Sequence, residues 1–309
     1  MSVQTPAPTF GPAVPEQITP ERILHRLDWQ VIRRLDGLFQ GDYRTLFYGH
    51  GLDFADLREY QPQDDIRHID WNVTARMNSP YVRNFVEERE ITAWFLLDLS
   101  ASMGFGPAER PKETVLVDFV TTLARLLTRS GNRVGAILYN NRIERTIPPR
   151  SGRNQVLRLT RDMLRESNPP PGTSTDLKVL LQSGFNTLKR RSLVILVSDF
   201  ISEPGWEHSL ALLNQRHELL AVRLLDPQEV ELPDAGLIVV EDAETGEHLY
   251  VDTSDPQFRR NFLAAAQRRE AALSASLKRA GADLYTVSTA DDLIQAIVRM
   301  AQLRKRRRR

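Results

Sequence analysis

One apolar stretch constrains this chain more than any other. It runs from Ile91 to Leu97 and ends in Asp98, and two hydroxyls follow at Ser100 and Ser102. Such a run is typical of a strand buried on both faces in a parallel sheet. Asp98 would then lie at the carboxyl end of the strand, where open α/β sheets bind their ligands, and both serines would lie in the following loop.

The carboxylate and the two hydroxyls can present three oxygens to a hard cation. Mg2+ prefers oxygen ligands in octahedral geometry, and Mn2+ accepts similar ligands. Alone, Asp-x-Ser-x-Ser is also the pattern of a turn or a helix cap, where serine is favoured. Two later segments favour the metal. A polar loop before a periodic helix offers Thr173 and Thr175, and a second apolar strand, from Leu193, ends at Asp199.

These three parts, in this order, resemble the von Willebrand factor A domain and its metal-ion-dependent adhesion site. The matching positions are Asp98, Ser100, Ser102, Thr175 and Asp199. The resemblance implies that the hydroxyls touch the ion directly or through water, that the acids orient waters, and that a partner's carboxylate completes the coordination. Thr173 remains a rival to Thr175 because both lie on one loop. Phe200 departs from the glycine common after this aspartate in extracellular A domains.

A second resemblance precedes the first strand. Residues 57–71 read Leu-Arg-Glu-Tyr-Gln-Pro-Gln-Asp-Asp-Ile-Arg-His-Ile-Asp-Trp, and a possible strand over 81–90 leads toward Asp98. This pattern, clearest over 49–105, is similar to the bacterial family called Domain of Unknown Function 58. The resemblance implies an adaptor that works with a MoxR-type AAA+ ATPase. We expect the charged residues of this block to pair with one another, to hold Trp71 in one shape, and to pin a loop-rich subdomain to the sheet. Direct ligand binding is the alternative role for these residues, which are Arg58, Asp65, Arg67 and Asp70.

Helical and strand patterns alternate along the rest of the chain. Helices are predicted over 19–39, 113–130, 154–166, 176–189, 207–216, 256–280 and 291–303. Strands are predicted over 91–98, 133–139, 142–147 (ended by two prolines), 192–199, 218–225 and 283–288, and a hairpin inserted in the sheet region over 237–252. This alternation predicts an α/β domain over 90–303, with a mainly parallel sheet and helices on both faces. The first resemblance implies that this domain is von Willebrand factor A-like (Rossmann-like).

The flanking segments are predicted to have different characters. Residues 1–18 are rich in proline and are expected to be disordered. Residues 19–89 are expected to form a helical and loop-rich segment that packs on the main domain. Residues 304–309 are all basic, with no aromatics among them. We expect a solvated tail that could touch anionic surfaces, and no nucleic-acid partner.

Composition excludes several classes of function. The 309 residues include no cysteine, which excludes disulfides, thiolate metal sites and cysteine nucleophiles. The 41% hydrophobic and 26% charged content is typical of a soluble globular protein. No apolar stretch approaches the roughly 18–20 residues of a membrane span, and the N-terminus lacks the basic start and apolar core of a signal peptide. We therefore expect a cytoplasmic protein.

The usual catalytic motifs are also missing from the sequence. It contains no Gly-x-x-x-x-Gly-Lys-Ser/Thr loop, no Gly-x-Ser-x-Gly elbow and no His-Glu-x-x-His helix. Asp98 could serve as a nucleophile in phosphoryl transfer, but Ser100 stands where aspartyl phosphatases carry a second acid. We expect a non-enzymatic, metal-dependent protein-binding module that takes a client protein's carboxylate. A metal-free scaffold and an Asp98-dependent phosphoryl-transfer enzyme remain as alternatives.

Overall fold

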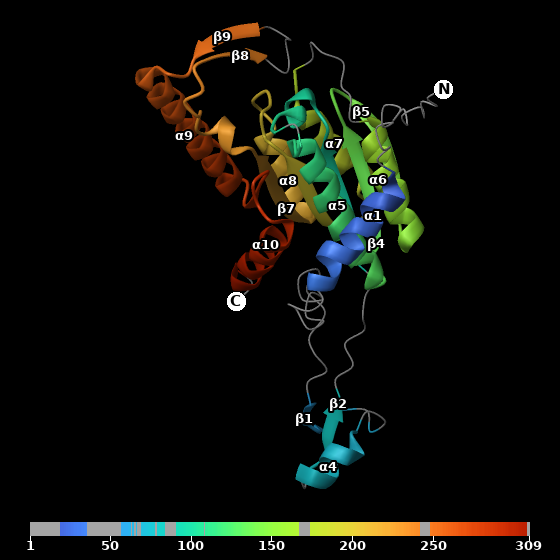
Figure 1. Ribbon diagram of the computed structural model, residues 1–309. Coiled ribbons are helices and arrows are strands. Elements are labelled where there is room, and N and C mark those ends of the chain that lie inside the picture. The colour runs from blue at the N-terminus through green and yellow to red at the C-terminus, as the bar shows by residue number, and fades with distance from the viewer. Residues whose placement is uncertain are drawn as a thin grey trace, which may run out of the picture.

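A six-stranded sheet forms the centre of the structure (Figure 1). The computed structural model describes residues 19–35, 57–62, 64, 66, 69–77, 79–83, 91–107, 109–166, 174–241 and 248–307. In spatial order the strands are β10 (Asp283–Ser288), β7 (Glu218–Leu225), β6 (Leu193–Ser198), β3 (Thr92–Asp98), β4 (Arg133–Tyr139) and β5 (Ile143–Arg150). All neighbours are parallel except β4 and β5. This is the mainly parallel sheet that the sequence predicts.

The direction of strand addition reverses beside β3. From β3 the chain adds β4 and β5 on one side, then returns to add β6, β7 and β10 on the other side. Ligands of open α/β sheets bind at the carboxyl ends of the strands where the order reverses. Leu97 of β3 pairs with Val197 of β6. Asp98 and Asp199 therefore lie at the same end of the sheet, at this reversal point.

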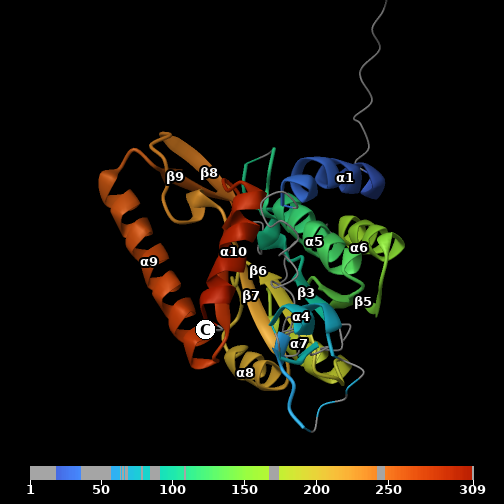
Figure 2. The ribbon, with the colours of Figure 1, turned by 90° about the horizontal axis from the view of Figure 1, so that it is seen from below.

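Helices cover both faces of the sheet (Figure 2). One face carries α1 (Pro20–Leu27), α5 (Lys112–Arg129), α6 (Arg153–Glu166) and α10 (Leu293–Arg307). The other carries α7 (Leu177–Thr187), α8 (Glu207–Arg216) and α9 (Pro256–Arg279). Strand β3 shows why two layers are needed. Phe95 and Leu97 enter the first core, whereas Trp94 and Leu96 enter the second, because alternate residues point to opposite faces.

The first described helix packs on the main body. Thr19 caps it, and its buried leucines and isoleucines join the core beneath α5 and α6. After Leu27 the helix continues through a π-helical turn, Asp28–Ile32, which the apolar periodicity did not predict. Arg125 of α5 donates to Asp28 at 3.1 Å and ties this turn down. The last part of the predicted helix, 36–39, lies outside the described residues.

Strand β5 contradicts the prediction that two prolines end it. The strand runs through Pro148 and Pro149 to Arg150. Proline is tolerated because β5 is an edge strand, where a missing N–H can face away from the neighbouring strand. Pairing with β4 is also irregular around Gly135, where a Cβ would lie 2.9 Å from the backbone oxygen of Ile147. Only glycine allows the two strands to approach this closely.

Two further small sheets lie outside the central one. Strands β8 (Leu237–Glu241) and β9 (His248–Asp252) form the predicted inserted hairpin, which is a two-stranded sheet of its own. Strands β1 (Leu57–Glu59) and β2 (Tyr81–Arg83) pair antiparallel beside α4 (Trp71–Met77). Figure 1 shows this β1–α4–β2 unit below the central sheet.

The charged block of the sequence stabilises the β1–α4–β2 unit itself. Arg58 Nη1 donates to Asp64 Oδ2 at 2.7 Å, and Asp70 Oδ1 accepts from the backbone N–H of Asn72 at 3.0 Å. These bonds lie within the unit, not between it and the sheet. Trp71, the first residue of α4, is 70% exposed. Asp65 and Arg67 lie outside the part of the chain that the structure describes.

The basic end of the chain begins inside helix α10. The helix passes its predicted end and runs to Arg307. The Arg304 side chain is 6% exposed and forms an ion pair with Glu218 at the start of β7. The expectation of a solvated tail from 304 onward is thus wrong for Arg304. It continues the buried helical stripe of Ile297 and Met300, which the run of basic residues concealed.

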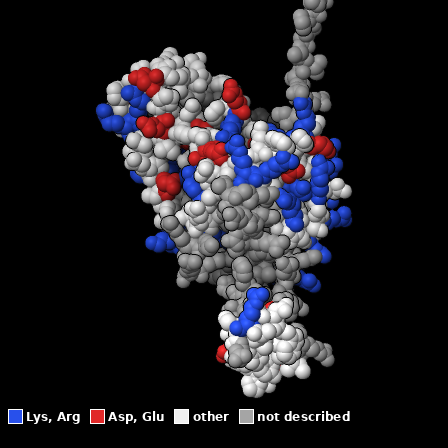
Figure 3. Space-filling model, turned by 60° about the horizontal axis from the view of Figure 1, so that its bottom comes forward, with Lys and Arg blue, Asp and Glu red and all other residues white. Residues whose placement is uncertain are grey.

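Lys and Arg also gather on the face over α1 and α6 (Figure 3). The exposed arginines of α1, of the helical residues that follow its π-helical turn, and of α6 are Arg22, Arg26, Arg33, Arg34, Arg153, Arg161 and Arg165. A basic face of this kind attracts acidic surfaces. Among the residues that the structure describes, every helix is too short or too polar to cross a lipid bilayer.

Candidate metal-binding site

Asp98 is the buried centre of the candidate site. It ends β3 and has no exposed surface. Its Oδ1 accepts from the Ser100 backbone N–H at 3.0 Å, and its Oδ2 accepts from the Ser198 hydroxyl at 2.6 Å. Burial, together with the charge of Asp199, raises the pKa of Asp98 to about 6, although the hydrogen bonds from Ser198 and Ser100 lower it. The carboxylate is therefore fixed in place and lies close to a second acid.

The two serines follow β3 in one tight turn. Ser100 precedes and Ser102 lies within the short 3-10 helix Ala101–Gly104. Both side chains are buried, and their hydroxyls form a hydrogen bond with each other, with the two oxygens 3.2 Å apart. Neighbouring ligands of an octahedral Mg2+ are about 3 Å apart when each bond is about 2.1 Å. The pair thus has the spacing of two adjacent ligands.

Neither hydroxyl serves as the helix cap that the alternative interpretation requires. Ser100 is at the N-cap of the 3-10 helix, but its side chain makes no capping hydrogen bond. The following helix, α5, has Pro111 at its N-cap and no side-chain cap. Helix capping therefore does not explain why two hydroxyls lie here.

Thr175 lies on the loop before α7, and this loop is tied to both neighbouring segments. Its backbone oxygen accepts from the Ser202 hydroxyl at 3.0 Å, in the segment that follows β6. The next backbone N–H, of Asp176, donates to the Tyr139 hydroxyl at 2.9 Å, at the end of β4. The Thr175 side chain is buried beside this edge. Thr173 lies outside the described residues, so the choice between the two threonines stays open.

Asp199 is held by a lysine that the sequence analysis missed. Its Oδ2 accepts from Lys112 Nζ at 2.7 Å, and its Oδ1 accepts from the Ile201 backbone N–H at 3.0 Å. Lys112 is fully buried and also donates to Glu229 Oε1 at 2.5 Å. Burial lowers the pKa of Lys112, but the two carboxylates outweigh it and raise that pKa above its ordinary value. The ammonium therefore stays charged and neutralises Asp199.

This edge of the sheet fits a hard divalent cation in part. Three segments far apart in the chain meet here: the end of β3, the loop before α7 and the segment after β6. Ser100 and Ser102 offer hydroxyl oxygens, the Asp98 carboxylate beside them accepts from Ser100 and Ser198, and Asp199 is engaged by Lys112. In the described ranges no group of three or more His, Asp or Glu forms a metal cluster. A cation here would depend on hydroxyls for much of its coordination.

Comparison with known proteins places the chain in a family. Residues 56–272 match the family described as "Protein of unknown function DUF58". This chain belongs to the DUF58 family. Uncharacterized proteins of Mycobacterium bovis and Mycobacterium tuberculosis (strain H37Rv) are each 35% identical to this DUF58 protein over 283 residues, which is 92% of this chain and 89% of each relative. The family expected from the sequence is confirmed.

Solved structures show a more distant likeness to the DUF58 protein. BatB from Bacteroides thetaiotaomicron is 13% identical with a TM-score of 0.42, covering 69% of this chain and 99% of BatB. The vWF domain of the type V pili tip protein Mfa5 from Porphyromonas gingivalis is 14% identical with a TM-score of 0.37, covering 70% of this chain and 95% of that domain. The strand order and the two helical layers confirm the predicted α/β fold class.

Phe200 of the DUF58 protein adopts a backbone conformation that favours glycine. Its φ of 61° is left-handed, which costs about 1–2 kcal/mol for a residue with a side chain. The Phe200 ring packs against Trp206, with ring centroids 5.6 Å apart. This aromatic contact offsets part of the strain. The loop after Asp199 thus keeps a glycine-like shape with a bulky residue.

Three residues of this site were absent from the predicted set. Ser198 was visible as the last residue of a strand, next to Asp199. Lys112 is the first residue of α5, where a positive charge interacts unfavourably with the helix dipole. A lysine at this position could have indicated that an acid elsewhere pairs with it. Glu229 lies more than a hundred residues from Lys112 in the chain, and no local pattern links the two.

Proposed function

We propose that this DUF58 protein is a non-enzymatic protein-interaction module whose binding edge holds Mg2+ or Mn2+. The observation that carries the proposal is the pair of buried hydroxyls, Ser100 and Ser102, 3.2 Å apart and unused as caps, beside Asp98. We assign Thr175 and Asp199 to the same site. Hydroxyls neutralise little of a cation's charge, so a bound ion would remain electrophilic. A carboxylate of a client protein can then complete its coordination.

The position of Asp98 disfavours the phosphoryl-transfer alternative. A nucleophilic carboxylate must reach the phosphorus atom of its substrate. Asp98 has no exposed surface, and both of its oxygens accept hydrogen bonds, from Ser100 and Ser198. A carboxylate held in this way orients its neighbours rather than attacking a ligand. The arrangement therefore supports binding over catalysis.

The partner that we propose is a MoxR-type AAA+ ATPase, acting with this protein on a client complex. The family resemblance supports this choice. Two surfaces offer further contacts. One is the basic face over α1 and α6. The other is the β1–α4–β2 unit, which exposes three large apolar side chains: Ile66, Trp71 and Met77. Exposed apolar groups on so small a unit are typical of an interface.

A pull-down tests the proposal. The immobilised full chain is mixed with the MoxR-type ATPase of the same organism, with Mg2+ or with excess chelator. We expect capture with Mg2+, loss with chelator, and loss in the Ser100→Ala/Ser102→Ala variant. The Ser254→Ala/Ser274→Ala variant changes two exposed serines elsewhere and should bind normally.

The other outcomes are equally informative. Capture that is indifferent to chelator and to the serines would contradict the metal-bridged version and favour a metal-free scaffold. Absence of capture under every condition would overturn the ATPase partnership.

A further inference from the structure

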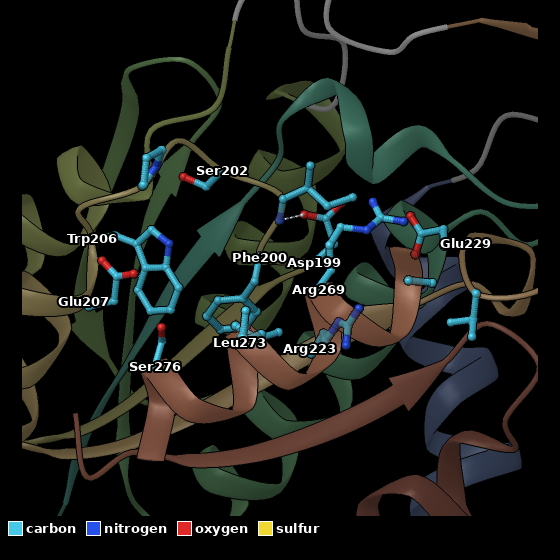
Figure 4. Close-up of a pocket in the computed structure, with 15 residues that line it drawn as sticks. Asp199, Phe200, Ser202, Trp206, Glu207, Arg223, Glu229, Arg269, Leu273 and Ser276 are labelled. Carbon is cyan, nitrogen blue, oxygen red and sulfur yellow. Dashed lines mark hydrogen bonds between the residues drawn. The ribbon is translucent and has the colours of Figure 1, made fainter. Parts of the chain in front are cut away.

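A pocket of about 330 Å³ lies beside the candidate metal-binding edge, against helix α9 (Figure 4). Its walls come from the segment after β6, from β7, from the end of the short helix Pro227–Glu229, and from α9. Asp199 belongs both to the edge and to the pocket wall. The volume is at the lower end of the range for ligand pockets, which suits one large side chain with its backbone.

One half of the pocket is apolar. Phe200, Trp206 and Leu273 line it, and Figure 4 shows these side chains on the same side of the pocket. Two alanines of α9, Ala266 and Ala272, contribute only methyl groups and leave the space open. Two aromatic rings and a leucine form a surface that favours an apolar group of similar size.

The other half of the pocket contains two arginines, Arg223 and Arg269. Arg223 follows Leu219 and Ala221 on the same side of β7, where the sheet otherwise packs into the second core. Its side chain is 13% exposed and forms an ion pair with Glu270. That pair uses Nη1, and the buried Nε has no hydrogen-bond partner among the described residues. Buried donors without acceptors are costly, and a ligand acceptor would remove that cost.

The acids of the pocket do not satisfy these arginines. Asp199 and Glu229 both accept from the Lys112 ammonium. Glu207 accepts from the Gly205 backbone N–H at 3.1 Å, beside Trp206. Arg269 is exposed and makes no hydrogen bond or ion pair with any residue that the structure describes. The spare donors are therefore those of the two arginines, and a guanidinium binds a carboxylate with two parallel hydrogen bonds.

We infer that this pocket binds a peptide segment in which a large apolar side chain lies next to a carboxylate, most simply a carboxy-terminal phenylalanine or leucine. The apolar group packs on Phe200, Trp206 and Leu273, and the carboxylate binds Arg223 and Arg269. The inference rests on the proposed function in assigning the ligand to a protein partner. The chemistry of the pocket requires no metal.

Fluorine NMR of the full chain labelled with 5-fluorotryptophan tests this inference. The chain has four tryptophans, and Trp206→Phe identifies the signal that reports on the pocket. The probes are N-acetyl-Gly-Ser-Gly-Phe with a free carboxylate, the same peptide with a terminal amide, and N-acetylphenylalanine, all in excess chelator. We expect the free-carboxylate peptide to shift the Trp206 signal saturably and to bind at least about tenfold tighter than the amide.

Matched variants on α9 locate the binding. Arg269→Gln should weaken the peptide about tenfold, whereas Arg268→Gln, its neighbour outside the pocket, should not. Ala272→Trp should close the pocket, whereas Ala271→Trp, also exposed on α9 but outside the lining, should leave binding unchanged. All four substitutions are at exposed positions, so folding should be retained.

Several results would overturn the inference. The first is a Trp206 signal that the free-carboxylate peptide does not shift, and the second is equal affinity for the free-carboxylate and amide peptides. The third is an equal effect on peptide binding of Arg269→Gln and Arg268→Gln, or of Ala272→Trp and Ala271→Trp. N-acetylphenylalanine binding as tightly as the peptide would assign the pocket to small carboxylic acids rather than to a protein partner. Because chelator is present, peptide binding without metal-dependent capture of the ATPase would preserve the pocket while refuting the proposed metal bridge.

Discussion

Replacing Lys112 by methionine removes the ammonium that donates to both Asp199 and Glu229. Methionine keeps the length and much of the volume of the lysine stem, so the change is mainly one of charge. The two acids that remain have side-chain exposures of only 1% and 15%. They would lose the ammonium that donates to both of them, and the more distant charge of Arg223 would remain nearby.

The cost follows from the burial of the three groups. Removing one partner of a buried ion pair costs about 3–5 kcal/mol, because the other charge stays buried and unpaired. Lys112 serves two carboxylates, so we expect Lys112→Met to lower the free energy of unfolding by about 4 kcal/mol at pH 7. Adding Asp199→Asn removes the more deeply buried acid. The double variant should return to within about 2 kcal/mol of the unaltered protein.

Urea unfolding in the presence of chelator, followed by circular dichroism, measures these differences. A loss below about 1 kcal/mol for Lys112→Met would show that the ammonium is not needed as a counter-ion. A double variant no more stable than Lys112→Met would show that Asp199 is not the acid that depends on it.

Variants of Lys112, Asp199 and Glu229 also test whether Asp199 belongs to the metal site. Lys112→Met/Glu229→Gln and Lys112→Met/Asp199→Asn have equal formal charge and differ only in which acid remains. A freed Asp199 adds a negative ligand, so the first variant should bind Mn2+ at least about tenfold tighter than the second. Equal affinities would remove Asp199 from the candidate set.

Three further changes test other parts of the structure. Without metal, the pKa of Asp98 is raised in the native state, which therefore keeps a proton that the unfolded chain loses between about pH 4 and about pH 6. The free energy of unfolding should fall over this range by up to about 3 kcal/mol. Urea unfolding at a series of pH values should show a smaller fall for Asp98→Asn, and an equal fall in the two proteins would contradict the prediction. Gly135→Ala should cost about 2–3 kcal/mol in urea unfolding, because its Cβ would lie 2.9 Å from the Ile147 oxygen and 3.1 Å from the Trp94 ring. Arg304→Ala should cost about 2 kcal/mol through its buried ion pair with Glu218, against less than about 0.5 kcal/mol for the exposed Arg268→Ala; equal losses would contradict the burial of Arg304.

The features that could be predicted from the sequence are those that depend on residues close together in the chain. Helix α8 and strand β7 begin and end at the predicted residues because their periodicity and boundary residues are local. The strand-end acids Asp98 and Asp199 were also visible, since an apolar run that ends in an acid marks the edge of a parallel sheet. Their shared position then followed from the alternation of strands and helices.

Features that depend on distant contacts were not predicted. The lysine that neutralises Asp199 lies 87 residues before it, and its second acid lies 117 residues after the lysine. Periodicity cannot show such a pairing, because it arises only when three loops meet. The prediction that β5 ends before Pro148 and Pro149 was wrong for a related reason. Proline is tolerated in a strand at the edge of a sheet, and which strand lies at the edge is a property of the whole sheet.

Isothermal titration of the purified full chain with Mn2+ and with Mg2+ is the most direct test of the proposed metal-binding edge. We predict one site per chain, lost in Ser100→Ala/Ser102→Ala and retained in Ser254→Ala/Ser274→Ala, because only the first pair lies 3.2 Å apart beside Asp98. Absence of binding to the unaltered protein, or binding that both double variants retain equally, would contradict the account.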